Sequence, residues 1–140
     1  MNQELTELQK QIVRFYHHNP FVEYLHIQVQ PLPTGEVRLE LPIDEVHTNL
    51  YGIAHGGVLM TMADTAMGAA CLACNKKVVT ISLTTDFLHA VPLTAKVLHD
   101  GRHTMTCESE LKSEDGKIFA KAHGNFYVLG KFVEEGNEDA

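Results

Sequence analysis

The chain has few basic residues and no basic cluster. It carries 11 Lys and Arg against 18 Asp and Glu, a formal net charge of −7, and its longest basic run is Lys76-Lys77. Binding to the phosphates of nucleic acid or to an anionic membrane surface draws on concentrated positive charge. The composition therefore indicates that neither nucleic acid nor membrane is a partner.

Cysteine is also scarce. Two of the three cysteines, Cys71 and Cys74, have the C-x-x-C spacing of redox pairs and half zinc sites, but no second such motif follows. Both fall inside an apolar stretch, and Cys107 alternates with Met105 on an expected strand. We interpret all three as small buried side chains, and we expect no metal and no cofactor.

The sequence has no internal repeats, and we expect no targeting segment. Its first ten residues, MNQELTELQK, have neither the basic nor the apolar region of a signal peptide, so we expect a cytoplasmic protein. At 140 residues the sequence is long enough for one domain with a real core, which we place at 1–133. The acidic segment 134–140 is expected to be a disordered tail.

Hydrophobic periodicity predicts an α+β fold. Apolar residues three and four apart (Leu5, Leu8, Ile12 and Phe15) indicate an N-terminal helix within 1–19, which Asn19-Pro20 ends. Alternating apolar residues predict strands over 25–29 and 37–41, then a long helix at about 55–74 and four antiparallel strands. The sheet must cover its apolar face, and the long helix is the candidate. The first of the four later strands is predicted to carry five residues on one face: Val79, Ile81, Leu83, Thr85 and Phe87.

The long helix is apolar nearly all the way round, which is typical of a helix at the centre of a domain. Between Gly56 and Cys74, Asp64 is the only ionisable residue apart from two thiols. A buried carboxylate costs free energy unless a partner compensates it. Asp64 is therefore a candidate for chemistry, and its presence argues against a membrane span.

Two glycines at the start of this helix suit the binding of a carbonyl oxygen. Gly56 and Gly57 fall where backbone N–H groups have no intrahelical partner and where the helix dipole favours negative charge. A tight turn into the helix would explain them equally well. Gly56 and Asp64 are ~12 Å apart along the helix. One carbonyl can therefore reach both only if two antiparallel helices pair across a two-fold axis, as in an isologous dimer.

The segment around these residues resembles a known family. The pattern Asn49-x-x-Gly52-x-x-His55-Gly56-Gly57, followed by the run from Met62 to Ala66 that contains Asp64, is similar to hotdog-fold acyl-CoA thioesterases, most of all to their phenylacetate-pathway (PaaI-like) branch. The resemblance implies an antiparallel sheet wrapped around the long helix and hydrolysis of acyl-CoA without a cofactor. It also implies a homodimer that is often doubled to a homotetramer.

Thioester hydrolysis needs a donor for the developing oxyanion and a base or nucleophile. We predict that Asp64 acts as base on water or attacks directly, and that the Gly56 N–H polarises the carbonyl. Gly57 is predicted to contact the substrate as well.

Three further residues are predicted to support these groups. The Asn49 amide is suited to orient water or the carboxylate, although a turn role is nearly as good an explanation. His55 has a near-neutral ordinary pKa, but in the resembled family the histidine at this place is mostly positional. Ser82 is a candidate for holding the attacking water.

Two other functions stay open. A hotdog hydratase or dehydratase would pair a histidine with a carboxylate for proton transfer at the β-carbon, and the glycine pair at this spacing from Asp64 argues against it. A non-catalytic acyl-CoA-binding protein is the second. If it were a regulator, the roughly 20 residues before the first strand would be too few for a helix-turn-helix.

Overall fold

The structure, a computed structural model, describes residues 4–32, 36–87, 93–112 and 118–133. In chain order its elements are α1 (Glu7–His17), α2 (Pro20–Tyr24), β1 (Gln28–Pro31), β2 (Val37–Glu40), the 3₁₀ helix η1 (Glu45–His47), α3 (Gly56–Ala73), β3 (Lys76–Phe87), β4 (Leu93–Asp100), β5 (Thr104–Lys112) and β6 (Ile118–Lys131). The predicted order of two strands, a long helix and four strands is confirmed.

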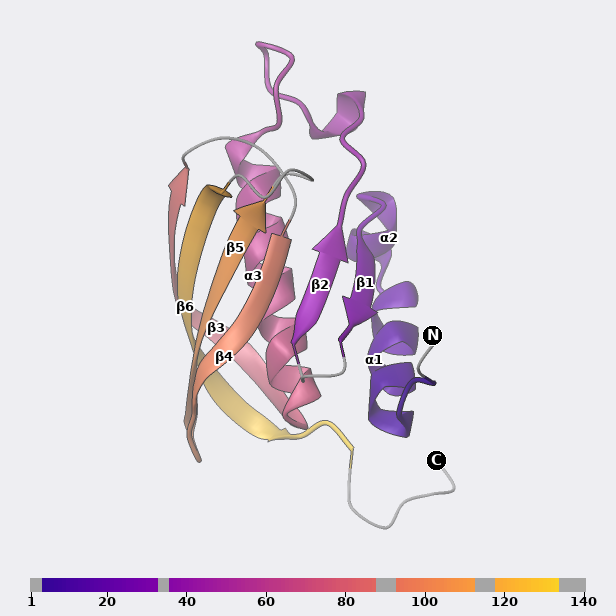
Figure 1. Ribbon diagram of the computed structural model, residues 1–140, viewed down its shortest axis with the longest axis vertical. Helices are drawn as coiled ribbons and strands as arrows, with labels where there is room; N and C mark the ends of the chain where they lie inside the picture. Colours follow the sequence, from indigo (N-terminus) through magenta and orange to yellow (C-terminus); the bar gives the residue numbers. More distant parts are fainter. Residues whose placement is uncertain (1–3, 33–35, 88–92, 113–117, 134–140) are drawn as a thin grey trace.

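The six strands form one antiparallel sheet in the order β1-β2-β4-β5-β6-β3. The sheet curves around α3, which lies against its inner face, while α1 and α2 pack beside β1 (Figure 1). Strands β1 and β3 are the two edges. The predicted arrangement, a sheet wrapped around one long central helix, is therefore confirmed.

Small residues on β6 let α3 approach the sheet closely. Ala120, Ala122 and Gly124 point inward, and a Cβ at Gly124 would lie only 3.0 Å from the Met67 Cε of α3. Among the described residues, α3 is the one helix whose length and mean hydropathy of 1.3 would fit a membrane span, yet half of it is buried within the protein. It is the core helix that the sequence predicts.

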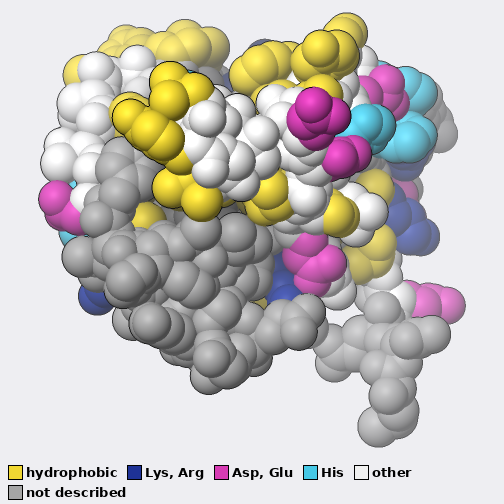
Figure 2. Space-filling model, turned by 90° about the horizontal axis from the view of Figure 1, so that it is seen from above, with side chains coloured by type: hydrophobic (Ala, Val, Ile, Leu, Met, Phe, Trp, Pro, Cys, Tyr) yellow, Lys and Arg dark blue, Asp and Glu magenta, His cyan; other side chains and the backbone are white. Residues whose placement is uncertain are grey.

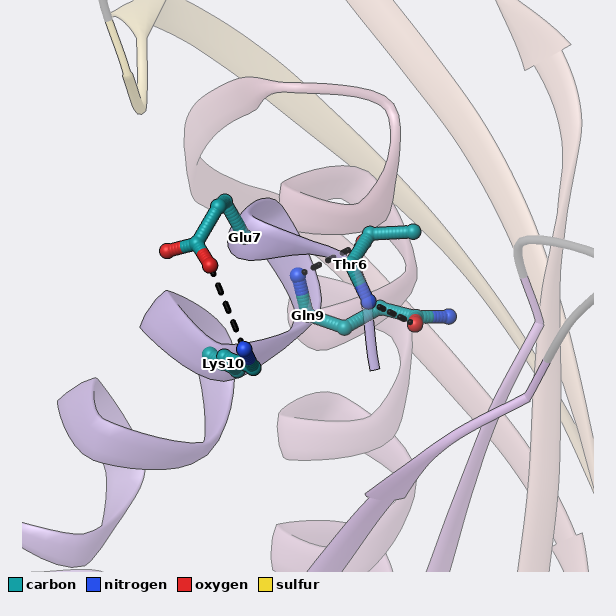
Figure 3. Close-up of polar contacts among 4 residues, drawn as sticks. All are labelled: Thr6, Glu7, Gln9 and Lys10. Carbon is teal, nitrogen blue, oxygen red and sulfur yellow. Dashed lines mark hydrogen bonds and ion pairs between the residues drawn. The ribbon is translucent and has the colours of Figure 1, made fainter. Parts of the chain in front are cut away.

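Helix α1 begins with a capping box. Thr6 accepts from the backbone N–H of Gln9 and its own N–H donates to the Gln9 side chain (Figure 3), which satisfies two N-terminal donors. Ile12 is fully buried as predicted, but Phe15 is 53% exposed. Tyr16 packs against the core instead, because the buried stripe continues from Ile12 by four residues rather than three.

The chain after α1 differs from the prediction. Asn19 caps a second short helix through a bond from the Val22 N–H, with Pro20 at its first position, as Asn-Pro favours. Residues 25–27 therefore form the turn that follows this helix rather than opening a strand. His26 adopts a left-handed conformation with φ 60°, and β1 starts only at Gln28.

A bulge changes the faces of β3. Ile81 has no partner on β6, so the register shifts between Thr80 and Ser82. Before the bulge Val79 pairs with exposed Tyr127, and after it Leu83 pairs with buried Gly124. The prediction that Val79 shares a face with Leu83 is therefore wrong, because one extra residue reverses the alternation.

Candidate active site

Asp64 is half-buried on α3 and has a partner on the edge strand. Its Oδ1 accepts a hydrogen bond of 2.6 Å from the Thr80 hydroxyl. Thr80 points toward α3 because it precedes the bulge and pairs with buried Phe126. A hydrogen bond to a carboxylate fixes its orientation and offsets part of its desolvation. The sequence analysis chose Ser82 and missed Thr80. Simple alternation places both residues on the same face, so it could not tell which of them lies beside Asp64.

A cleft of about 400 Å³ opens beside this pair. Asp64 and Thr80 line it together with residues of α1, α2, α3, β3 and β6: Tyr16, Asn19, Phe21, Val22, Thr61, Thr65, Gly68, Val78, Val79 and Phe126. The cleft thus combines one carboxylate with aromatic and aliphatic walls. Such a combination suits a mostly apolar ligand that carries one reactive polar group.

The start of α3 leaves one backbone donor unpaired. His55 caps the helix, and its Nδ1 accepts from the Gly57 N–H at 2.8 Å. Among the described residues no acceptor faces the Gly56 N–H. Gly56 is therefore available to polarise a carbonyl, whereas the Gly57 N–H is already used. Gly57 has a steric reason to be glycine, since a Cβ there would lie 3.0 Å from His55 Nδ1.

The capping bond also constrains what His55 can do. With Nδ1 accepting, a neutral imidazole carries its hydrogen on Nε2. Neither ring nitrogen is then free to accept a proton from water unless the cap is broken. This geometry supports the positional role predicted for His55.

Asn49 organises the loop that leads into the site. Its Oδ1 accepts from the N–H groups of Tyr51 and Ile53, at 2.9 and 3.3 Å, in a turn where Gly52 has φ 77°. Within the described part of the chain, the amide nitrogen has no partner. The turn role is thus present, and the amide N–H₂ can still donate to water or to a carboxylate.

His47, which the sequence analysis did not single out, anchors this loop. It is fully buried, accepts from the Asp44 N–H through Nδ1 and donates from Nε2 to the Leu25 carbonyl. Its own carbonyl accepts from the His55 N–H at 2.8 Å. His47 therefore connects the end of α2 to the N-cap of α3.

Ser82 lies away from these groups. It follows the bulge, pairs with exposed Asn125, and its hydroxyl accepts from the Asn125 amide at 3.1 Å. Ser82 and Asn125 share the outer face of the sheet, whereas Asp64 lies on the inner side. Within one chain the structure brings Asp64 to Thr80 and not to Ser82.

Two of the three thiols are core residues, and the third is half-buried. Cys71 and Cys107 are fully buried with their sulfurs 3.4 Å apart, and Cys74 caps the end of α3. The contact with Cys107 and burial raise the pKa of Cys71. In the described ranges no three His, Cys, Asp or Glu side chains group as metal ligands. His99 and His103 are four residues apart beside the β4–β5 turn, a spacing that metal sites use, but they belong to no such group.

A family model described as the thioesterase superfamily matches residues 51–120. A protein of Saccharolobus solfataricus whose name assigns it provisionally to the esterases is 36% identical over 80% of this chain and 85% of its own length. The chain belongs to the thioesterase superfamily. It is thus a hotdog-fold thioester hydrolase.

Comparisons with E. coli PaaI in sequence and in structure place the chain near the PaaI-like branch. The acyl-coenzyme A thioesterase PaaI of Escherichia coli is 26% identical over 82% of this chain and 86% of its own length. The solved structure of E. coli PaaI superposes with a TM-score of 0.81 at 24% identity, covering 91% of this chain and 98% of that one. A thioesterase structure from Streptococcus pneumoniae that contains coenzyme A gives 0.76 at 22% identity, covering 85% and 98%.

Proposed function

We propose that this protein is a cytoplasmic acyl-CoA thioesterase, which hydrolyses the thioester to a free acid and CoA. The single observation that carries the proposal is the Asp64–Thr80 pair at the wall of an apolar cleft. The names of E. coli PaaI and of the coenzyme A complex from S. pneumoniae support CoA as the thiol part of the substrate.

In the proposed reaction, Asp64 either removes a proton from water or attacks the carbonyl carbon itself. In both routes the carbonyl oxygen gains negative charge, which the Gly56 N–H and the positive end of the α3 dipole stabilise. In the first route the resulting hydroxide adds to the carbonyl carbon, the C–S bond breaks, and the leaving CoA thiolate takes the proton that Asp64 removed from water. In the second route loss of the thiolate leaves an anhydride between Asp64 and the acyl group; water then hydrolyses it, which restores the Asp64 carboxylate, frees the acid and supplies the proton of the thiol. Thr80 holds one Asp64 oxygen, so that the other oxygen faces the substrate.

Thr80 gains support from the S. pneumoniae thioesterase. That protein was crystallised with an aspartate replaced by alanine, and separately with a threonine replaced by alanine, at positions 16 residues apart. Asp64 and Thr80 have the same spacing of 16 residues in this chain.

The active site is proposed to form between two copies of the chain. Gly56 and Asp64 are ~12 Å apart along α3, so a single chain cannot place both on one carbonyl. Edge strand β3 exposes Val79 and Ile81, at 48% and 59%, and an uncovered apolar edge favours pairing with another strand. The loop before α3 also carries exposed apolar side chains: Val46, Leu50, Tyr51 and Ile53. Figure 2, seen from above Figure 1, shows apolar side chains gathered at that end of the molecule.

Substitution of Asp64 tests the proposal. Asp64→Asn keeps the size of the side chain and should lower kcat for acyl-CoA hydrolysis by roughly two to four orders of magnitude, the range for a positioned base. His55→Ala should cost less, because His55 supports the helix start. Release of free CoA measures both, and thermal unfolding checks the fold. Near-normal turnover by folded Asp64→Asn would refute the assignment.

A further inference from the structure

The cleft beside Asp64 has a defined far end. Gly68 lies four residues beyond Asp64 on α3, about one helical turn or ~6 Å along the axis, and both residues line the cleft. Opposite Gly68 stands Tyr16 of α1, whose hydroxyl would be 3.8 Å from a Cβ at position 68. The cleft therefore runs from the reacting carboxylate toward the tyrosine.

The backbone conformation at Gly68 does not require glycine. It lies inside a regular helix, where glycine is less favourable than alanine. A Cβ at this position would meet no atom closer than 3.8 Å, which is ordinary van der Waals contact. A side chain at position 68 would narrow the space between α3 and Tyr16. The missing side chain thus keeps that end of the cleft open.

Tyr16 is held firmly enough to act as a wall. Its ring packs against the hydrophobic core and lies edge-on to Phe15, with centroids 5.6 Å apart. Burial, the Cys71 thiol and the Asp64 carboxylate raise the pKa of the phenol, in that order of size, so the group stays neutral at physiological pH. A neutral aromatic wall suits an apolar acyl group.

We propose that Tyr16 and Gly68 together set the depth of the acyl-binding cleft and so determine which acyl groups the enzyme accepts. This inference rests on the proposed thioesterase function. A depth of ~6 Å beyond the carboxylate admits a chain of roughly five carbons or a single aromatic ring. Longer straight chains meet the Tyr16 ring.

A length series of straight-chain acyl-CoA substrates, from acetyl to decanoyl, tests the proposal through kcat/KM. The wild type should peak near pentanoyl and fall for longer chains. Tyr16→Ala should raise the ratio of decanoyl to butanoyl activity about tenfold or more, the scale of size discrimination in an apolar pocket. Gly68→Val should act in the opposite sense, lowering pentanoyl against acetyl activity by a similar factor.

Two control variants distinguish a change in the depth of the cleft from general damage to the protein. Tyr16→Phe keeps the ring and should keep the length profile of the wild type. Tyr24→Ala removes the same side chain type from α2 at an exposed position outside the cleft, and should also leave the profile unchanged. If Tyr16→Ala does not fold, Gly68→Val still changes the profile from the other wall.

The outcomes distinguish this inference from the proposed function. Turnover with the same length profile in wild type, Tyr16→Ala and Gly68→Val overturns the inference alone. An equal shift in Tyr24→Ala does so as well, because the effect would then not come from the cleft. If the wild type releases CoA from no acyl-CoA at all, the proposed function fails and the inference fails with it.

Discussion

At the scale of single residues, substitution of Thr80 measures how much its hydrogen bond to Asp64 contributes to turnover. Thr80→Val removes the hydroxyl that donates to Asp64 at 2.6 Å and nearly preserves the shape. Hydrogen bonds to charged groups are worth about 1.5–3 kcal/mol, so we expect kcat to fall about ten- to a hundredfold. Thr80→Ser should restore most of it.

Ser82 supplies the matched control for this prediction. It lies on the same strand two residues later, but its hydroxyl contacts Asn125 on the outer face. Ser82→Ala should therefore leave kcat close to that of the wild type. If Ser82→Ala reduces turnover more than Thr80→Val, then Ser82 reaches the site through another copy of the chain, and the role given to Thr80 is wrong.

At the scale of elements, the two longer helices and the order of the strands along the chain were predictable, whereas α2 and the details of β3 were not. Helix 55–74 follows from an apolar run bounded by His55 and Cys74, and α3 occupies 56–73. The bulge at Ile81 is an irregularity of the backbone, and no glycine in the sequence indicates it. Because of this bulge Thr80 rather than Ser82 contacts Asp64. Periodicity assumes an unbroken ladder, so it could not find this pair.

Asn19-Pro20 shows a second limit of the same kind. The dipeptide correctly predicts the end of α1, but it also opens α2, because a side-chain acceptor followed by proline is itself a helix start. The sequence also predicts a turn at 31–35 and a hairpin at Asp115-Gly116. These two segments and the predicted tail at 134–140 lie wholly or mainly outside the described residues.

A prediction at the same scale concerns edge strand β3, which we propose pairs with β3 of a second chain. In the double variant Val79→Lys with Ile81→Lys, a two-fold pairing of β3 strands would bring like charges together, which is destabilising. We expect light scattering to show monomers in place of dimers, with activity lost. The control adds the same charge elsewhere: Leu98→Lys with Tyr24→Lys, at exposed positions on β4 and α2. A dimer that survives in the β3 variant would exclude this edge as the interface.

At the scale of the whole molecule, the chemistry is expected to need no metal and no free thiol. EDTA should leave kcat unchanged, and mild alkylation of the folded protein should do the same. Cys71 and Cys107 are fully buried, and the raised pKa of Cys71 keeps its reactive thiolate form scarce at neutral pH. Mass spectrometry counts the modified cysteines beside the activity assay. Activity lost with EDTA and regained with zinc would contradict this expectation.

Mixing two inactive variants tests whether each active site is shared between two chains. One variant is Asp64→Asn, and the other is Gly56→Leu, whose side chain blocks the carbonyl position. Each alone should be nearly inactive. If each site takes Gly56 from one chain and Asp64 from the other, a heterodimer has one doubly damaged site and one intact site. Random pairing makes about half the dimers mixed, so roughly a quarter of wild-type activity should return.

The alternative geometry predicts a different number. Were each site built within one chain, every site in the mixture would carry one lesion, and no activity would return. The ~12 Å between Gly56 and Asp64 along one helix argues against that geometry, since a thioester carbonyl cannot span it. Native mass spectrometry must show that mixed dimers have formed. An inactive mixture with such dimers present would rule out the cross-subunit site and require both groups to act from within one chain.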